Sequence, residues 1–182
     1  MNQCKQCGGA GEFVTEKLAS FDAPESLLGI GGVQVCDAVE IAKCAHCNAV
    51  NRTSIPDMSE LIAAVAVWRI MLPIKLNGKE IRFLRNAAGW QAKRLAKELD
   101  VSAESVSRWE HDEMMAPANE KVLRSTLGAR LCNEAPGIKF DQNWINSMKI
   151  SGPRGTSADI PMSFIRVLIK PKKEAWNPRK AA

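Results

Sequence analysis

The sequence predicts a mixed α+β fold: a small N-terminal β module, then an all-α domain, then a C-terminal extension that contains a strand. Two C-x-x-C pairs enclose a segment at 33–43 that is rich in β-branched residues. Short amphipathic helical patterns follow one another over residues 78–131. Beyond them, IPMSFIRVLIK, near 161–170, has the β-branched and aromatic composition of a further strand.

Shifts in composition divide the 182 residues into four parts. They are a cysteine-containing module (1–56), a connecting helix (57–76), a helical domain (77–135) and a C-terminal extension (136–182). The hydrophobic share of 46% and the charged share of 25% are typical of a folded protein. The longest apolar run, LIAAVAVWRIML, is too short to span a membrane, and the N-terminus lacks an apolar signal segment. We therefore expect a cytoplasmic protein with no membrane partner.

The charge is unevenly distributed along the chain. The formal net charge is +5, but residues 1–56 carry −2, residues 57–135 carry +1 and residues 136–182 carry +6. Within the middle part, residues 75–97 hold seven basic side chains against one acid, Glu80. Such a local excess favours a nucleic-acid-binding surface, although solvated basic faces are also common.

The N-terminal module is expected to combine loops and few strands. Residues 1–12 are predicted to form a glycine-rich loop and residues 15–32 a longer loop. Residues 33–43 are predicted to form one or two strands, and residues 50–58 a linker.

The connecting segment SELIAAVAVWRIM is predicted to form a helix that Asp57 or Ser59 caps and Pro73 ends. It is apolar on nearly every side, so we expect it to be buried on more than one face. Either a dimer interface or a position between two modules would provide that burial.

The two C-x-x-C pairs predict a metal site. Their members are Cys4, Cys7, Cys44 and Cys47. Two tight turns that each supply two thiolates make a closed four-sulfur site, so we expect one structural Zn²⁺ per chain in a zinc-ribbon-like module. The alternative is that these thiols are free or redox-active. Cys36 and Cys132 are expected in the core, although Cys36 could be a spare ligand, and His46 is expected to be exposed.

The segment GWQAKRLAKELDVSAESVSRWEHDE predicts two short helices joined by a tight turn, with Ser102 as the cap of the second. Apolar residues at helical spacing can pack into one core: Leu95, Ala96, Leu99, Val101, Val106 and Trp109. The opposite face of the second helix presents Ala103, Glu104, Ser107 and Arg108. A recognition helix presents such a face to the major groove of DNA, so the pattern indicates a helix–turn–helix.

Helices are also predicted on both sides of this motif. KEIRFLRNAA places Ile81, Leu84 and Arg85 about one turn apart. ANEKVLRSTLGARL, which starts just after Pro117, turns four residues inward: Val122, Leu123, Leu127 and Leu131.

At this point the chain resembles a known group. LNGKEIRFLRNAAGWQAKRLAKELDVSAESVSRWEHD resembles the XRE, lambda-repressor-like helix–turn–helix. With the cysteine pairs and the connecting helix, residues 1–132 resemble the YgiT-type zinc finger/helix–turn–helix regulators, which include MqsA-type antitoxins. The resemblance implies a homodimeric repressor, often of its own gene, that binds palindromic double-stranded operator DNA. In some members it implies an antitoxin that binds a neighbouring toxin protein.

The resemblance also implies DNA contacts at particular positions. The implied contact residues are Gln91, Lys93, Ser102, Ala103, Glu104, Ser105, Ser107 and Arg108. Among them, Arg108 could bind guanine in a bidentate manner, which is worth about 1–3 kcal/mol of discrimination. Its alternative is an i,i+4 ion pair with Glu104, worth about 0.2–0.5 kcal/mol. Members usually carry a serine or threonine where Gln91 stands and a glycine where Asp112 stands.

Two other functional classes stay open on the sequence. One is a protein-interaction adaptor whose XRE-like fold does not bind DNA, and the other is a thiol redox protein. We expect no enzyme, because neither histidine forms an acid/base arrangement with a C-x-x-C pair. The strand near 161–170 could pair with a sheet edge. The basic KPKKEAWNPRKAA is expected to be a solvated terminus, the alternative being a segment that reaches along DNA with Trp176 as an anchor.

Overall fold

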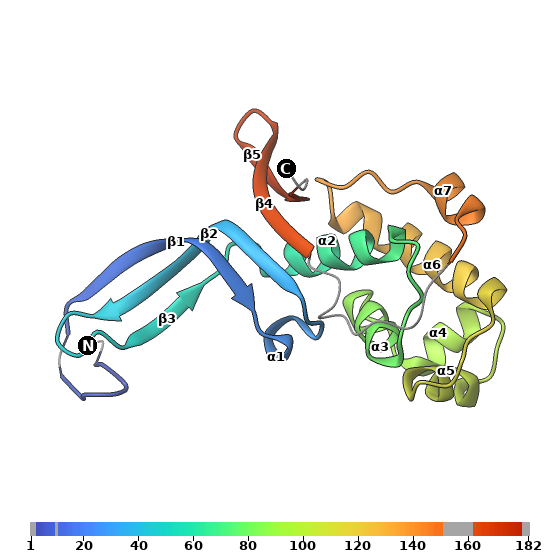
Figure 1. Cartoon of the computed structure of the whole chain (residues 1–182), viewed down its shortest axis with the longest axis horizontal. Helices are drawn as coiled ribbons and strands as arrows, with labels where there is room; N and C mark the ends of the chain where they lie inside the picture. The colour runs from blue at the N-terminus through green and yellow to red at the C-terminus, as the bar shows by residue number, and fades with distance from the viewer. Residues whose placement is uncertain (1–2, 10, 151–161, 180–182) are drawn as a thin grey trace.

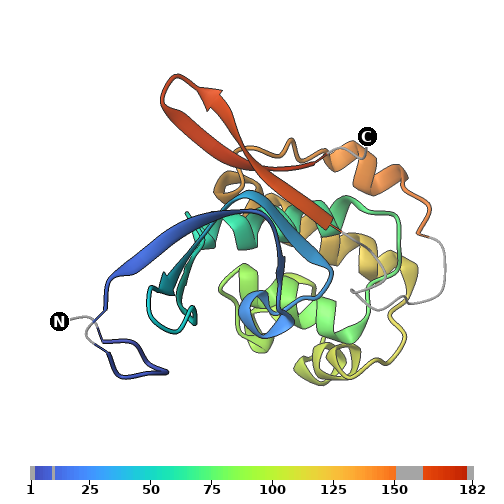
Figure 2. The ribbon, with the colours of Figure 1, turned by 60° about the vertical axis from the view of Figure 1, so that its left-hand side comes forward.

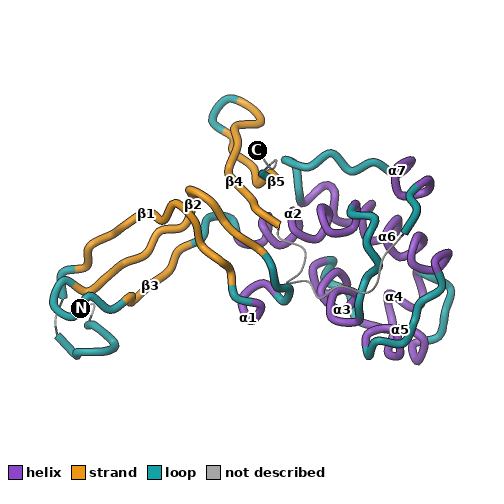
Figure 3. Tube along the Cα trace, viewed as in Figure 1, coloured by secondary structure: helices purple, strands orange, loops and turns teal. Residues whose placement is uncertain are grey.

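Three strands build an arm that projects from a body of helices (Figure 1). The computed structural model describes residues 3–9, 11–150 and 162–179. The arm and the short helix at its base comprise β1 (Phe13–Ala23), α1 (Glu25–Leu28), β2 (Val33–Cys44) and β3 (Val50–Ser54). Figure 3 shows the strands gathered at one side and the helices at the other, so the predicted mixed α+β fold is confirmed.

β2 is the central strand of the sheet. It pairs antiparallel with β1 along its whole length, from Phe13↔Cys44 to Ala23↔Val33. On its other side the C-terminal half of β2 pairs with β3 and its N-terminal half pairs in parallel with a strand from the C-terminal extension. This central position buries the β-branched residues of β2, namely Val33, Val35, Val39 and Ile41.

Two sequence predictions for the arm are wrong. The sequence predicts a loop at 15–32 and a linker at 50–58, whereas β1 and α1 occupy most of the first range and β3 occupies most of the second. The reason is exposure: both faces of the arm meet solvent along most of β1, so polar residues such as Glu16 and Lys17 replace the usual apolar alternation.

The helical body has seven helical elements in the described part of the chain besides α1. They are α2 (Met58–Met71), α3 (Gly78–Ala87), α4 (Ala92–Glu98), α5 (Ala103–Glu110), α6 (Pro117–Leu131), the 3₁₀ turn η1 (Cys132–Glu134) and α7 (Gln142–Ser147). Their apolar faces and the base of the arm share one core, which reaches along β2 to Val39. Two inward-facing predictions fail, because Val122 is 48% exposed and Cys132 is only half-buried. None of the described helices has the length and apolarity that crossing a membrane requires.

α2 packs between the helices of the body and the C-terminal hairpin. It contacts α3, α6, η1 and the C-terminal hairpin. Residues from Leu61 to Val67 are almost all fully buried within the single chain. The apolar surface of α2 is therefore accounted for without a dimer interface on this helix.

The C-terminal extension forms a hairpin of β4 (Met162–Lys170) and β5 (Lys173–Pro178). The strand predicted near 161–170 is confirmed, and it pairs with a sheet edge of its own chain: Val33↔Met162. The expectation of a solvated basic terminus is wrong for β5, because Trp176 is fully buried. Its backbone N–H donates to Glu60 and its indole N–H to the carbonyl of Pro56. Figures 1 and 2 show one end of the hairpin beside α2 and the base of the arm, with its turn directed away from the helical body.

Two buried ion pairs fix the connection between α2 and α3. Arg69 and Glu80 form a bidentate pair with N–O distances of 2.6 and 2.7 Å, and both side chains are fully buried. Arg124 pairs with Glu120 and donates to the carbonyls of residues 70, 72 and 74. Burial lowers the pKa of Arg124, while the hydrogen bond and charge of Glu120 oppose that shift. The polar backbone of this turn is thus satisfied by charged side chains, which fixes the helical domain to α2.

Candidate metal centre and candidate DNA interface

The four cysteines of the two C-x-x-C pairs lie in two loops of matching shape at the tip of the arm. In the first loop the N–H of Gly8 donates to the carbonyl of Cys4 at 2.9 Å, and in the second the N–H of Asn48 donates to Cys44 at 2.9 Å. Gly8 has φ of 68° and Asn48 has φ of 59°, a left-handed conformation that glycine and asparagine tolerate best. Each tight turn therefore directs two thiols to the same side.

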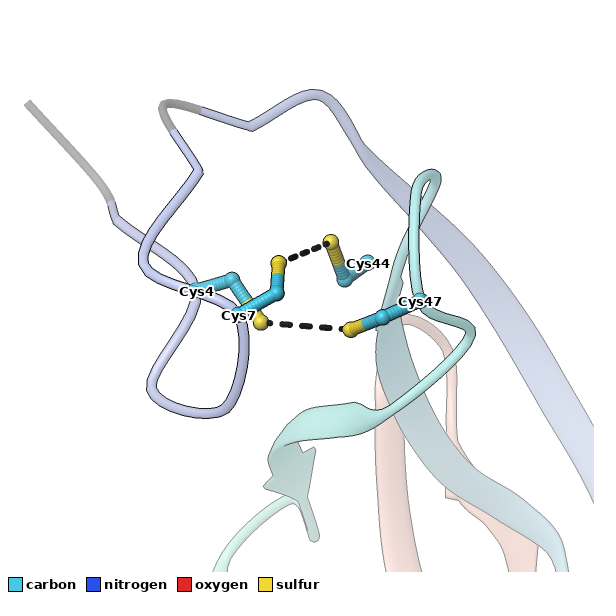
Figure 4. A group of neighbouring side chains, drawn as sticks. All are labelled: Cys4, Cys7, Cys44 and Cys47. Atoms are coloured by element: carbon cyan, nitrogen blue, oxygen red, sulfur yellow. Dashed lines mark hydrogen bonds between the residues drawn. The ribbon is translucent and has the colours of Figure 1, made fainter.

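The thiols converge in the geometry of a tetrahedral metal site (Figure 4). The Sγ atoms of Cys4 and Cys47 are 3.6 Å apart, and those of Cys7 and Cys44 are 3.8 Å apart. All four Sγ atoms lie within 4.8 Å of one another. A tetrahedron with Zn–S bonds of about 2.3 Å has S–S edges of about 3.8 Å. The four cysteines could therefore hold a metal ion without rearrangement of the loops.

Backbone N–H groups aimed at the sulfurs favour thiolates. The N–H groups of Cys7 and Gln6 lower the pKa of Cys4 to about 6. Those of Cys47 and His46 lower the pKa of Cys44. The N–H of Ala49 also lowers the pKa of Cys47, but burial and the three neighbouring thiols outweigh it and raise that pKa to about 12. Four thiolates this close need a cation between them, which is the electrostatic requirement of a metal site.

The remaining cysteines and His46 take no part in this cluster. Cys36 is fully buried in β2, and its thiol donates to Gln34 at 3.7 Å, so the core interpretation is confirmed over that of a spare ligand. His46 is exposed in the second loop, as expected.

α4 and α5 form the predicted pair of helices joined by a tight turn. Ser102 accepts from the N–H of Ser105 at 3.1 Å, which confirms it as the cap of α5. Asp100 has φ of 53°, and the N–H of Val101 donates to the carbonyl of Ala96, so the turn is closed by the backbone. The helices meet through Leu95, Ala96, Val106 and Trp109, which are all buried.

The residues with implied DNA contacts lie on the outer side of this pair. The exposed ones are Gln91, Lys93, Ser102, Glu104, Ser107 and Arg108, and the half-buried ones are Ala103 and Ser105. Gln91 precedes α4 without a side-chain capping bond, in agreement with its departure from the usual serine or threonine. Six of these eight side chains are therefore accessible, at the start of α4 and on or just before α5.

Arg108 has a different acidic partner from the one the spacing suggested. Its Nε lies 3.4 Å from a carboxylate oxygen of Glu113, and its Nη2 lies 3.4 Å from the hydroxyl of Ser105. Glu104 instead has its pKa lowered first by its own backbone N–H, then by Ser102, with the charge of Arg108 contributing last. The ion pair of Arg108 is thus with the loop that follows α5 and not with Glu104, the partner considered as the alternative to base contact.

Asp112 stands where the resembled family has glycine, and the structure shows how this departure is accommodated. Its φ is 69°, in the left-handed region that favours glycine. Its carboxylate accepts from the N–H of Gly78 at 2.7 Å, at the start of α3. A Cβ at Gly78 would lie 2.6 Å from the carbonyl oxygen of Glu110, so the close approach requires glycine there. Asp112 thereby ties the loop after α5 to α3.

Sequence reasoning missed Glu110, which orients α5. Its carboxylate accepts from Arg85 at 2.5 Å and from Arg82 at 3.2 Å. Two of the seven basic residues at 75–97 therefore hold the fold together rather than face a ligand. The structure explains the pairing, because Glu110 is buried at the end of α5 and a buried carboxylate needs cations nearby. Lys93 and Lys97 keep exposed side chains on α4.

Comparison with known proteins agrees with this geometry. Residues 81–124, which run from α3 into α6, match the Helix-turn-helix family of XRE-type domains. That match supports a DNA-binding regulator. No curated protein and no solved structure matches the chain.

Proposed function

We propose that the chain is a sequence-specific transcriptional repressor that binds palindromic operator DNA as a homodimer, in or near its own promoter. The observation that carries the proposal is the match of residues 81–124 to the helix–turn–helix family, together with the exposed polar face of α5. Helix–turn–helix proteins place this second helix in the major groove. No catalytic role is included, because the four clustered thiols are arranged as metal ligands.

In this proposal Arg108 is the main base-reading residue. Its guanidinium is 60% exposed on α5 and can turn from Glu113 towards the two acceptors of a guanine edge. Glu104 and Ala103 would lie beside it at base edges. Ser102, Ser105 and Ser107 would contact bases or phosphates, and Gln91 and Lys93 would approach the backbone at the start of α4.

The same proposal assigns one structural Zn²⁺ to the cysteine cluster. The sulfur spacing and the N–H groups directed at Cys4 and Cys44 support it. Bound zinc would hold the two loops at the tip of the arm together and would supply no catalysis, because all four positions are filled by protein sulfur. An antitoxin function is a separate proposal, tested by co-purification with the product of a neighbouring toxin gene.

One observation favours a second candidate, a protein-interaction adaptor that does not bind DNA. Arg108 is already paired with Glu113, and Glu113 and Asp112 add negative charge beside α5. Such charge repels phosphate.

Fluorescence anisotropy separates the two candidates. The wild type would be titrated against duplexes from its own upstream region, with a scrambled duplex as competitor. The matched variants are Arg108→Ala and Arg130→Ala, since Arg130 is a partly exposed arginine on α6 that pairs with Glu134. If the chain is a repressor, the wild type and Arg130→Ala should bind the upstream duplex selectively, and Arg108→Ala should not. Weak binding that ignores sequence and both substitutions would contradict it and favour the adaptor.

A further inference from the structure

One face of the arm carries a hollow of about 500 Å³ close to the cysteine loops. Thr15 of β1, Ala42 of β2 and Arg52 of β3 are direct neighbours across the three strands. Directly opposite residues point to the same side of a sheet, so these three share one face. The complete lining consists of Gln3, Lys5, Phe13, Thr15, Ala42, Asn51 and Arg52.

The hollow is shaped by a short residue and by the first cysteine loop. Ala42 lies in the middle strand between the longer side chains of Thr15 and Arg52, so its small side chain leaves a depression at the centre of this face. Lys5, between Cys4 and Cys7, belongs to the wall. Its backbone N–H donates to the side chain of Asn51 at 3.1 Å, which attaches the loop to β3. The wall is therefore positioned by the cysteine cluster and by β3 together.

The lining of the hollow is positively charged, whereas residues 1–56 as a whole are acidic. Residues 1–56 hold four basic and six acidic side chains. Two of the four basic ones, Lys5 and Arg52, line the hollow, and none of the acids belongs to its lining among the described residues. The other two basic residues have acids beside them, since Lys43 pairs with Glu16 and Lys17 lies opposite Glu40. Cations are thus concentrated at one place on an otherwise acidic arm.

We propose that this hollow binds a phosphate of the DNA backbone outside the base pairs that α5 contacts. The inference rests on the proposed function, which makes DNA the partner. Lys5 and Arg52 supply the charge, while Gln3 and Thr15 supply hydrogen-bond donors of the kind that contact phosphates. Figure 1 places the tip of the arm and α5 near opposite ends of the longest axis, so the contact lengthens the site on DNA.

A backbone phosphate fits the lining better than a protein segment does. Protein hot spots lie in well-packed pockets that lose their water on binding. Here only Phe13 and Ala42 are apolar, and the hollow is open with exposed cations. Backbone contacts need no particular base sequence, which matches a site built from charge and amide groups.

Matched pairs of charge substitutions test the proposal. Lys5→Gln/Arg52→Gln removes the cations of the hollow, and Lys17→Gln/Lys43→Gln removes the other two basic charges of the arm. Each protein would be titrated against a short operator duplex and a flanked longer one, at several salt concentrations. For the hollow variant we expect the slope of log K against log salt to shrink by about one per lost phosphate contact, on the longer duplex only.

Two outcomes would contradict phosphate binding in the hollow without contradicting the proposed repressor function. They are equal slopes for all three proteins on the longer duplex, or equal losses for both pairs of substitutions. Failure of the wild type to bind either duplex selectively would instead overturn the proposed function, and the hollow with it. Phosphate ethylation interference with the wild type is independent of the folding of any variant. It should reveal a flanking phosphate whose ethylation weakens binding, and its absence would contradict the proposal.

Discussion

The arm and the helical body are stabilised in different ways. The body buries a contiguous apolar core and two ion pairs, Arg69–Glu80 and Arg124–Glu120. Beyond Val39, β2 stands outside that core, and the tip of the arm is held by strand pairing and by the cysteine loops. A long ribbon without a core is marginal in water, so a metal ion held by the four cysteines would take the place of packing at the tip. One chain thus combines a packed helical region with an arm whose tip relies on strand pairing and on four clustered cysteines.

Removal of metal from the cysteine cluster should have the largest effect, and that effect should be confined to the arm. Zinc binding supplies about 10–16 kcal/mol in zinc-finger peptides, so chelation or Cys44→Ser should open the two cysteine loops. Hydrogen exchange should show lost protection at the amides of Gly8 and Asn48, whose bonds close those loops. The amides of α2 and α6 should keep their protection from exchange. Loss of protection throughout the helices would mean that the metal supports the whole fold.

Breaking a buried ion pair should damage the body instead. Glu80→Ala leaves the charge of Arg69 buried without its carboxylate, and we expect the free energy of unfolding to fall by about 3–5 kcal/mol in urea titrations. The control is Glu98→Ala, which removes an exposed partner of Arg94 and should cost about 0–1 kcal/mol. Metal content should stay unchanged in both variants. If both substitutions lowered the free energy of unfolding equally, the buried pair would contribute no more to stability than the exposed pair does.

The smallest expected effect concerns the surface of α5. Glu113→Gln releases Arg108 from an exposed ion pair worth about 0–1 kcal/mol and removes a negative charge near DNA. DNA affinity measured by anisotropy should therefore rise by up to about fivefold. Glu134→Gln, which releases Arg130 on α6, should leave the affinity unchanged. A lower affinity for Glu113→Gln would mean that the pair helps to orient Arg108 on DNA.

The same contrast explains what the sequence could predict. In the body, apolar spacing and Ser102 located α4, α5 and the cap, because buried faces impose a helical period. In the arm, the spacing of the cysteines predicts their cluster. The polar β1 has no apolar alternation, so its sequence resembles that of a loop. β5 carries no clear strand signal, because it lies in a basic segment, 170–182, with four lysines and one arginine, although its one aromatic residue, Trp176, is buried.

The partners of charged residues were the hardest feature to foresee. Arg108 was paired by spacing with Glu104, whereas the loop after α5 brings Glu113 closer. Asp112 could not be placed, because its bond to Gly78 joins positions that are distant in sequence. Glu110 was missed for the same reason, since both of its arginines lie on α3. Contacts of this kind depend on tertiary packing, which local pattern does not specify.

The central claim is that α5 reads DNA through Arg108. The most direct measurement combines Arg108→Ala with single base-pair changes across the operator, using anisotropy at fixed salt. We expect one G·C position at which the wild type discriminates by about 1–3 kcal/mol and the variant does not, while discrimination elsewhere persists. If Arg108→Ala weakened binding to every sequence equally, or left every preference intact, Arg108 would not be a base-reading residue.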